Sequence, residues 1–520
     1  MWTEECICKK TVRRIIITRK EQYKDETTCM DSHAFDLYHL CSLFSCGDSD
    51  TSADTTPVNK TTAASETEAI TEPSYLDQYD GVDFGGEDYT LAVVALVEYP
   101  NYAGETSSGE PVNDAQYARD TWIEEHYNVK IQYVPYTDGN GKMLGDVQKQ
   151  VQAGDTAYDC LQAGLNYDLC PMSTIGVLAD MRSIDGLDLT SDWWSQSFNE
   201  TFTVNNKLYM STGPISFSYF YSPRIIAYNL QLAENYNIPN LYDVVNDGKW
   251  TLDYMYDLIR DFSADLNGDG KMTEDDLWGA SVDEYSAAGF FMSAGGTEME
   301  TDADGKPYFV IQNERNVEII EKVASIVGNA DLTQKAEALA SRSGTYNIQD
   351  KVYTFKNGNA LLLGYGAQAI AFYLRDMKDD YGIIPVPKYD ENQKDYITVG
   401  NPYVPAYIGI PMNNERGDMN GVILNTMGYL SRRDVQPLIS DVMLKGKAAR
   451  DEASHKMLDM IYSDMYLDLN CSYDFGGSFI LLRDITMGKK ENFTSQWQKL
   501  EKRANIALDK LYEQITATVE

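Results

Sequence analysis

The chain has 520 residues, more than one ordinary hydrophobic core accommodates, so two lobes or domains are expected. Its formal net charge of −37 at pH 7 excludes a basic track that could neutralise nucleic-acid phosphates, and it would repel an anionic lipid surface. No apolar run reaches the roughly 18 residues of a membrane-spanning helix.

Residues 1–45 form the first distinct segment. They mix basic and acidic residues and cysteines without periodicity, and their apolar runs are too short for a secretory signal peptide. The segment leads into the sequence LFSCG, whose cysteine is Cys46. This sequence resembles the cleavage box of a bacterial lipoprotein, although Phe44 is larger than that box usually allows. A lipid anchor on Cys46 and a chance match are both open interpretations.

Residues 46–85 are predicted to be a flexible linker. The run from residue 48 to residue 74 is rich in Ser, Thr, Asp and Glu and has no aromatic residue. Such a run cannot bury enough apolar surface to fold. Directly after Cys46, it fits a tether between a lipid anchor and a globular part.

Alternating strands and helices follow. Apolar runs predict strands at 91–97, 129–134 and 158–163, and helical spacing predicts helices at 114–127 and 143–153. This alternation implies a parallel sheet with helices on both faces. Because ligands bind at the carboxyl ends of such strands, the loops with Tyr99, Tyr102, Asn166 and Tyr167 are candidate binding loops.

The cysteines of the globular part do not form a disulfide framework. Cys160, Cys170 and Cys471 are odd in number and lack zinc-site spacing. Buried thiols are the favoured interpretation, and a bond between Cys160 and Cys170 is the alternative.

An acidic loop follows a predicted amphipathic helix at 251–262, for which Thr251 is a plausible N-cap. The loop, DLNGDGKMTEDD, matches the twelve-residue calcium loop of EF-hands, with Gly at position six and Asp in place of the usual Glu at position twelve. A structural Ca²⁺ is expected here, and an Asx-rich surface turn that binds no ion is the alternative. The expected ligands are Asp265, Asn267, Asp269, the carbonyl of Lys271, and Asp276.

Enzyme signatures are weak in this sequence. The run GYGAQA at 364–369 matches the looser dinucleotide fingerprint, but it lies deep in the second half of the chain. There is no GxSxG motif, and His126 and His455 both have the sequence context of surface residues. Paired carboxylates are uninformative in so acidic a chain.

Several sequence blocks together resemble one family. They are GDTAYDCLQAG, GVLADM, DWWSQ with NNKLYMSTG, the run YN…LAE.Y.IP.LYD.V..GKWT.D before the acidic loop, FKNGNALLLGYG, YGIIPVPKYDENQKDYIT and MLDMIYSDMYLD. In this order they resemble the extracellular solute-binding proteins of bacterial ABC importers. The likeness is to family 1, the sugar-binding type, to which maltose-binding protein is distantly related.

The resemblance implies an α/β fold of the bilobal, periplasmic-binding-protein-like type II, with two α/β lobes joined by a hinge and a ligand cleft between them. The first lobe would comprise residues 86–212 and 409–446, and the second lobe residues 220–404 and 450–520, including the acidic loop at 265–276. The chain would cross between the lobes near 211–223, 404–409 and 445–450.

The resemblance also implies a sugar site built from aromatic platforms and hydrogen-bonding groups. Ordinary half-buried packing is the alternative for each tyrosine. The candidates are Tyr102, Asn166, Tyr167, Trp194, Tyr219, Tyr221, Tyr285, Tyr365, Gln368, Asn401, Tyr403, Asp474 and Phe475.

The implied function is carbohydrate capture, with an oligosaccharide as the expected ligand, for delivery to importer permease subunits. The protein would be a monomer without catalytic activity, held on the outer face of a bacterial membrane only through lipid on Cys46. A family member should begin with a signal peptide, so we interpret residues 1–45 as the product of a wrong start or a frameshift. The alternatives are binding of a peptide or polyol, and a secreted calcium-stabilised carbohydrate-active enzyme.

Overall fold

The computed structural model describes residues 74–95, 106–137, 141–155, 157–443 and 452–517, all within one compact unit, Glu72–Glu520. Cys46, Tyr102, the whole segment 1–45 and the expected crossing at 445–450 lie outside the described residues. The folded part begins inside the predicted linker, because Tyr75–Tyr79 form a 3-10 helix whose Leu76 is buried.

The first sheet has the strand order β11-β3-β1-β2. Strands β1 (Glu87–Val94), β2 (Val129–Tyr136) and β3 (Cys160–Gly164) are parallel, and β11 (Ala406–Gly409) runs antiparallel to β3. The predicted strands and their parallel pairing are therefore confirmed, with one antiparallel edge strand added from far along the chain.

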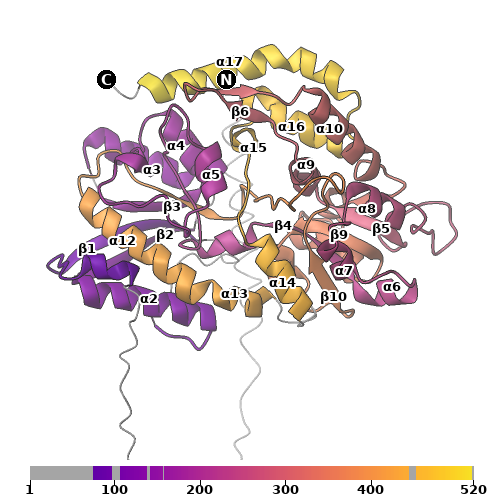
Figure 1. Ribbon diagram of the computed structural model, residues 1–520, viewed down its shortest axis with the longest axis horizontal. Coiled ribbons are helices and arrows are strands. Elements are labelled where there is room, and N and C mark those ends of the chain that lie inside the picture. Colours follow the sequence, from indigo (N-terminus) through magenta and orange to yellow (C-terminus); the bar gives the residue numbers. More distant parts are fainter. Residues whose placement is uncertain (1–73, 96–105, 138–140, 156, 444–451, 518–520) are drawn as a thin grey trace, which may run out of the picture. The chain divides into compact units, whose positions relative to one another are not determined.

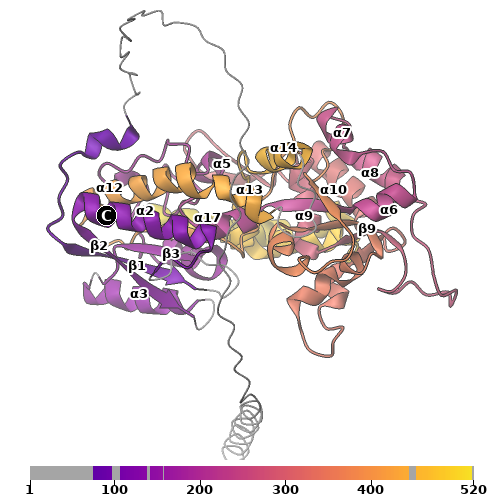
Figure 2. The same cartoon turned by 90° about the horizontal axis from the view of Figure 1, so that it is seen from below.

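Helices cover both faces of this sheet, as the strand–helix alternation predicts. On one face, Leu91 and Val93 share a core with α2 (Pro111–Tyr127) and α12 (Gly417–Leu430), which lie side by side in Figures 1 and 2. On the other face, Ala92 and Val94 share a core with α3 (Lys142–Ala153). Successive residues of a strand point to opposite faces, which is why β1 contributes to both cores.

The second sheet is mixed, with the order β10-β4-β9-β5-β8. Strand β5 pairs in parallel with β8 and β9, whereas β4 is antiparallel to both β9 and β10. The whole of β9 is buried, as its apolar sequence ALLLGYG requires. The bounds are β4 (Arg224–Asn229), β5 (Trp278–Val282), β8 (Thr333–Lys335), β9 (Ala360–Gly366) and β10 (Tyr381–Ile384).

The predicted helix before the acidic loop is confirmed as α8 (Leu252–Ile259), and the hydroxyl of Thr251 accepts the amide of Tyr254 as its N-cap. Around the second sheet lie further helices and a small hairpin. They are α6 (Leu230–Asn235), α7 (Leu241–Asn246), α9 (Glu284–Ser293), α10 (Glu314–Ile326), α11 (Tyr353–Lys356), α14 (Glu452–Ile461), α16 (Ser478–Thr486), and the strands β6 (Met299–Thr301) and β7 (Pro307–Phe309).

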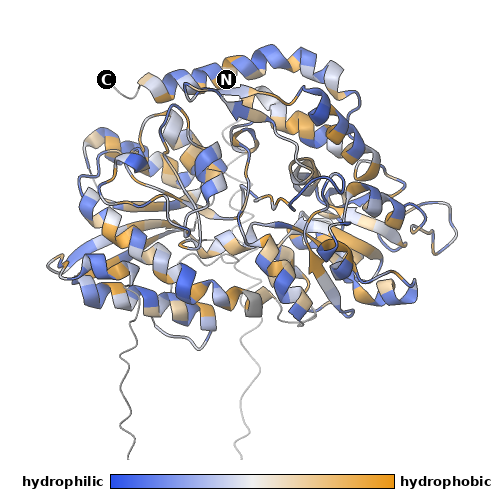
Figure 3. Ribbon diagram, viewed as in Figure 1, coloured by the Kyte–Doolittle hydropathy of each residue, from blue (hydrophilic) through white to orange (hydrophobic). Residues whose placement is uncertain are grey.

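The remaining helices are α4 (Cys170–Thr174), α5 (Gln196–Thr201), α13 (Pro437–Met443), α15 (Leu469–Tyr473) and α17 (Phe493–Ala517). The long helix α17 alternates hydrophilic and hydrophobic residues, as Figure 3 shows. It packs on α16, and near its end the carbonyl of Ile515 accepts a bond from Lys207. Helix α17 therefore contacts α16, which comes after the strands of the second sheet in the chain, and the loop with Lys207, which comes after strand β3 of the first sheet.

Cys160, Cys170 and Cys471 are buried free thiols, which confirms the favoured interpretation of the cysteines. Within the described ranges, no helix combines the length and the apolar character needed to cross a membrane.

Candidate functional site

Two loops meet at one edge of the first sheet. The carboxyl end of β3 and the amino end of antiparallel β11 coincide there, with Gly164 opposite Ala406. Tyr167 follows β3 in a single π-helical turn, and Tyr403 precedes β11. Their ring centroids are 6.0 Å apart, and Tyr167 is 47% exposed. Thus the two predicted tyrosines are neighbours, one of them open to solvent.

In the second sheet, helix α9 begins directly after strand β5. Strand β5 ends at Val282, and the carboxylate of Asp283 then accepts the amide of Ser286 as the N-cap of α9. Tyr285 lies in the first turn of that helix, with its ring centroid 4.9 Å from that of Tyr403. Through Tyr403, the edges of both sheets contribute to one group of rings, which we call the tyrosine cluster (Tyr167, Tyr285 and Tyr403).

Burial and the neighbouring Tyr285 raise the pKa of Tyr403, so its hydroxyl stays protonated at neutral pH. The side-chain oxygen of Asn401 accepts the amide of Tyr403, and the amide of Asn401 donates to Ser222 at 2.8 Å. Asn401 thus holds the backbone that carries Tyr403.

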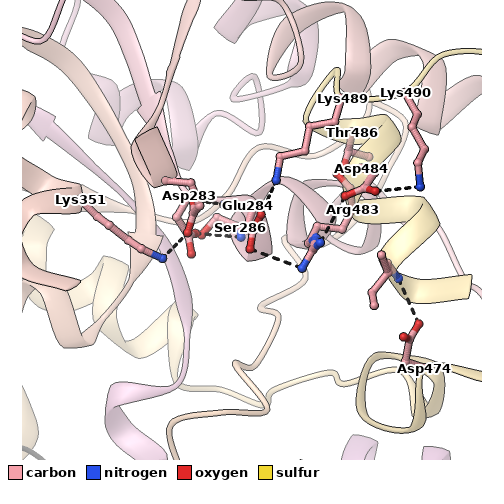
Figure 4. Close-up of polar contacts among 12 residues, drawn as sticks. Asp283, Glu284, Ser286, Lys351, Asp474, Arg483, Asp484, Thr486, Lys489 and Lys490 are labelled. Carbon is pink, nitrogen blue, oxygen red and sulfur yellow. Dashed lines mark hydrogen bonds and ion pairs between the residues drawn. The ribbon is translucent and has the colours of Figure 1, made fainter. Parts of the chain in front are cut away.

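Helix α16 provides two contacts to Tyr285. Phe479 stacks on it at 6.5 Å, and the guanidinium of Arg483 lies 5.6 Å from its ring centroid. Arg483 also pairs with Glu284 at 3.4 Å, and Lys489 pairs with the same carboxylate (Figure 4). Sequence analysis missed Phe479 and Arg483, although their spacing of four residues places both on one face of a helix.

A buried ion pair holds the start of α9, the helix whose first turn contains Tyr285. Arg224, at the start of β4, contacts Asp283 at 3.3 Å, and both side chains are at most 5% exposed. Arg224 also donates to the hydroxyl of Ser286 at 3.2 Å. The start of α9 is thus fixed to the second sheet by charge-assisted hydrogen bonds. Sequence analysis did not identify this pair either.

Three other candidates, Asn166, Gln368 and Tyr365, have no described contact with the rings of the tyrosine cluster. Asn166 neighbours Tyr167, and its side-chain oxygen is buried without a hydrogen-bond partner in the described part. The side-chain oxygen of Gln368 is also buried without a hydrogen-bond partner in the described part, and Gln368 as a whole is 3% exposed. Tyr365 is 2% exposed and packs on Tyr373 at 6.4 Å. Unsatisfied amide oxygens of this kind are groups that a ligand hydroxyl would satisfy.

Trp194 and the two candidates of the expected first crossing, Tyr219 and Tyr221, lie elsewhere in the molecule. Trp194 and Tyr219 are both buried and line a hollow of about 160 Å³ together with Arg432 and Asp464. Tyr221 is buried and meets Phe372 edge to face at 4.8 Å. These side chains pack within the molecule rather than against the tyrosine cluster.

Asp474 and Phe475 lie in the turn between α15 and α16. Asp474 has a left-handed backbone conformation (φ 45°), and its carboxylate accepts the amide of Ile480 at 3.1 Å. Phe475 is buried and stacks on Tyr473 at 5.4 Å. This turn starts the helix that carries Phe479 and Arg483 to Tyr285.

The acidic loop folds into consecutive turns. Asp265 accepts the amides of Gly268 and Gly270, Asn267 that of Asp269, and Asp269 that of Lys271. Asp276 is nearly fully buried and accepts the amides of Leu266 and Thr273.

The oxygens of this loop are of the type that Ca²⁺ prefers. However, among the described residues no three carboxylate, imidazole or thiol side chains come together as a metal-binding set. The hydrogen bonds are equally those of an Asx-rich turn, and calcium binding stays a prediction.

No protein-family model matches the sequence, and a search of curated proteins finds no match. Among solved structures, UspC from M. tuberculosis aligns over 81% of this chain and 100% of its own, with 16% identity and a TM-score of 0.52. A sugar transporter from Rhizobium etli, in an open conformation, aligns over 83% of this chain and 99% of its own, with 14% identity and a TM-score of 0.51. At these identities the likeness shows the fold alone, and it confirms the predicted α/β, bilobal, periplasmic-binding-protein-like class.

Proposed function

We propose that this protein is a solute-binding protein that captures a carbohydrate at the tyrosine cluster. The observation that carries the proposal is the meeting of both sheet edges at Tyr167, Tyr285 and Tyr403. Pyranose rings have flat apolar faces and a rim of hydroxyl groups, and tyrosine offers a matching ring and hydroxyl. The solved Rhizobium etli protein, described as a sugar transporter, supports the same class of ligand.

The ligand we propose is an uncharged oligosaccharide. Arg483 is the cation described over a ring of the cluster, and it and Lys489 are both paired with Glu284, while Arg224 is paired with Asp283. An acidic sugar would have to displace Glu284, whereas a neutral hydroxyl could pair with the unsatisfied side-chain oxygen of Asn166, the residue before Tyr167. Binding would close the two lobes over the sugar and present the closed form to an importer permease.

We further propose that Cys46 carries a lipid that holds the protein on the outer face of the membrane, and that Ca²⁺ in the loop 265–276 stabilises the second lobe. The lipid proposal is supported by the LFSCG box and the polar run that follows it. The calcium proposal is supported by the spacing of Asp265, Asn267 and Asp269, and neither proposal depends on the identity of the sugar.

A thermal-shift screen tests the function. The full chain is melted with panels of mono- and oligosaccharides, peptides and polyols at constant calcium. A ligand at one hundred times its dissociation constant adds about 2.7 kcal/mol to the free energy of unfolding, which raises Tm measurably. A rise in Tm confined to oligosaccharides supports the proposal, and a rise in Tm with peptides or polyols overturns the proposal that the ligand is a sugar. Intact sugar recovered after incubation supports binding without catalysis, and cleaved sugar favours the enzyme alternative.

A further inference from the structure

Two carboxyl groups are completely buried between the segment after α9 and helix α15. Glu298 and Asp468 are 0% and 1% exposed, and the amide of Glu298 donates to the carboxylate of Asp468 at 3.1 Å. Two buried negative charges so close together would repel each other and lose most of their solvation, so one of the two groups is expected to carry a proton.

The hydrogen bonds favour one of the two groups as the one that holds the proton. Asp468 accepts from the amide of Asn470, the hydroxyl of Tyr466 and the amide of Glu298, all within 3.1 Å. Glu298 accepts one bond, from the side-chain amide of Asn470 at 2.6 Å, and its other oxygen has no partner among the described residues. Three donors stabilise a carboxylate better than one, so the charge stays on Asp468 and the proton on Glu298.

Asn470 connects Glu298 to the turn before α16. Its side-chain oxygen accepts the amide of Phe475 at 3.0 Å and the hydroxyl of Ser478 at 2.7 Å. The turn contains three left-handed residues, Asp474, Gly476 and Gly477, with φ of 45°, 62° and 86°. Such a backbone persists only when surrounding contacts fix it, and Asn470 provides two of those contacts.

Helix α16 begins directly after this turn and carries Phe479 and Arg483 to the ring of Tyr285. We propose that Glu298 is a positioning residue which, in its uncharged form, holds α16 against Tyr285 of the ligand site. The proposal rests on the proposed function for its binding consequence, but not for the protonation of Glu298.

The surroundings of Glu298 fix the direction of the pH dependence. Burial and the neighbouring Asp468 raise its pKa well above the ordinary value, and Asp474 acts in the same direction. Tyr466 and Cys471 complete the titratable groups around the pair. Burial also raises the pKa of Asp474, although its bonds from the amides of Ile480 and Phe479 and the cations Arg483 and Arg503 act in the opposite direction.

Because the folded-state pKa of Glu298 is raised, its uncharged form is fully present at low pH and is lost as pH rises through that pKa. Sugar affinity should therefore fall as pH rises, by up to about tenfold per pH unit above the folded-state pKa.

The test compares sugar affinity of the wild type and Glu298→Gln from about pH 5 to pH 9. Glutamine keeps an uncharged oxygen acceptor for Asn470 and cannot ionise, so the variant should bind as the wild type does at low pH and lose the pH slope. Glu298→Ala removes the acceptor and should bind weakly at every pH. Glu300→Gln is the matched control, two residues away and exposed, and should keep the wild-type slope. A wild-type slope in Glu298→Gln would overturn the proposal.

Two measurements separate this proposal from the proposed function. Infrared spectra of the wild type near pH 6 should contain a protonated-acid carbonyl absorption that Glu298→Gln lacks; its absence overturns the proposal. Hydrogen exchange at the amides of Phe475 and Ile480 should accelerate with pH more steeply in the wild type than in Glu298→Gln. If no sugar binds, the proposed function fails, while these two measurements still decide the role of Glu298.

Discussion

Tyr285 is the residue at which most contacts of the candidate site converge. It touches Tyr403, which precedes β11, and Phe479 and Arg483, which both lie on α16. Aromatic contacts of this kind contribute about 0.5–1.5 kcal/mol beyond the area they bury. The ring, rather than the hydroxyl, is expected to supply most of the affinity for a sugar.

Tyr285→Ala should therefore weaken sugar binding about 10-fold or more, while Tyr285→Phe should lose only the smaller contribution of one hydroxyl. Isothermal titration of both variants measures the difference. Tyr308→Ala is the control, because Tyr308 is an exposed tyrosine that hydrogen-bonds to Glu300 and lies outside the cluster. Normal binding by Tyr285→Ala would remove the tyrosine cluster as the ligand site.

The ion pair of Arg224 and Asp283 should matter for folding more than any surface pair. Asp283→Ala leaves the buried Arg224 without its carboxylate partner, which costs about 3–5 kcal/mol. Urea unfolding of the variant should show this loss. Asp247→Ala breaks an exposed pair with Lys249 and should cost less than about 1 kcal/mol. Equal effects of the two substitutions would contradict the structural role given to Asp283.

At this scale the sequence predicted single residues better than their partners. Tyr167, Tyr285 and Tyr403 were expected at the site, and the structure brings them together. Arg483 and the pair of Arg224 with Asp283 were missed, because each partner lies at least 59 residues away in the chain. Spacing along a sequence carries no information about such contacts.

Among the elements, the acidic loop makes the sharpest prediction. Asp265→Ala with Asp269→Ala should lower Tm and remove its dependence on calcium, because both carboxylates are expected Ca²⁺ ligands. Melting curves with excess calcium and with excess chelator measure this.

Asp302→Ala is the control for the loop. Asp302 also accepts backbone amides in an exposed turn, from Asp304 and Lys306, but it has no calcium-loop spacing. This variant should keep the response of Tm to calcium. Melting of the wild type that is identical in chelator and in calcium would show that the loop is an Asx-rich turn and binds no ion.

Helices and strands with a regular spacing of apolar residues were predictable from the sequence. Helices α2, α3 and α8 and strands β1, β2 and β3 lie where apolar spacing placed them, to within a few residues. Strand β11 carried no such signal, because it has four residues and its place beside β3 depends on pairing across more than 200 residues. The mixed order of the second sheet was unpredicted for the same reason.

For the whole molecule, two lobes follow from chain length and the first sheet with its helices follows from alternation, but the second sheet and the joining of the two do not. The boundaries of the lobes came only from the family resemblance, and they stay predictions. The structure adds that Tyr403, just before β11, contacts rings that follow β3 and β5. A ligand bound at Tyr403 would therefore contact the chain directly before the expected crossing at 404–409, where it could affect the expected hinge.

The net charge of −37 makes a prediction that belongs to no single residue. At neutral pH, unpaired carboxylates repel one another in the compact state, and this repulsion lowers the free energy of unfolding. Raising NaCl from about 0.01 M to 0.15 M shortens the screening length from about 30 Å to about 8 Å. Tm should therefore rise with salt at pH 7, and it should rise less at lower pH, where carboxylates are protonated.

Calorimetry with and without added NaCl at both pH values measures this effect, and KCl in place of NaCl controls for a specific sodium site. The buried pairs, such as Arg224 with Asp283, are screened little by salt, so they should not reverse the trend. A Tm that falls with salt at pH 7 would mean that exposed attractive pairs, such as Lys306 with Asp509, outweigh the repulsion. The sign of the salt effect thus decides whether the excess acidic charge opposes the fold or is locally compensated.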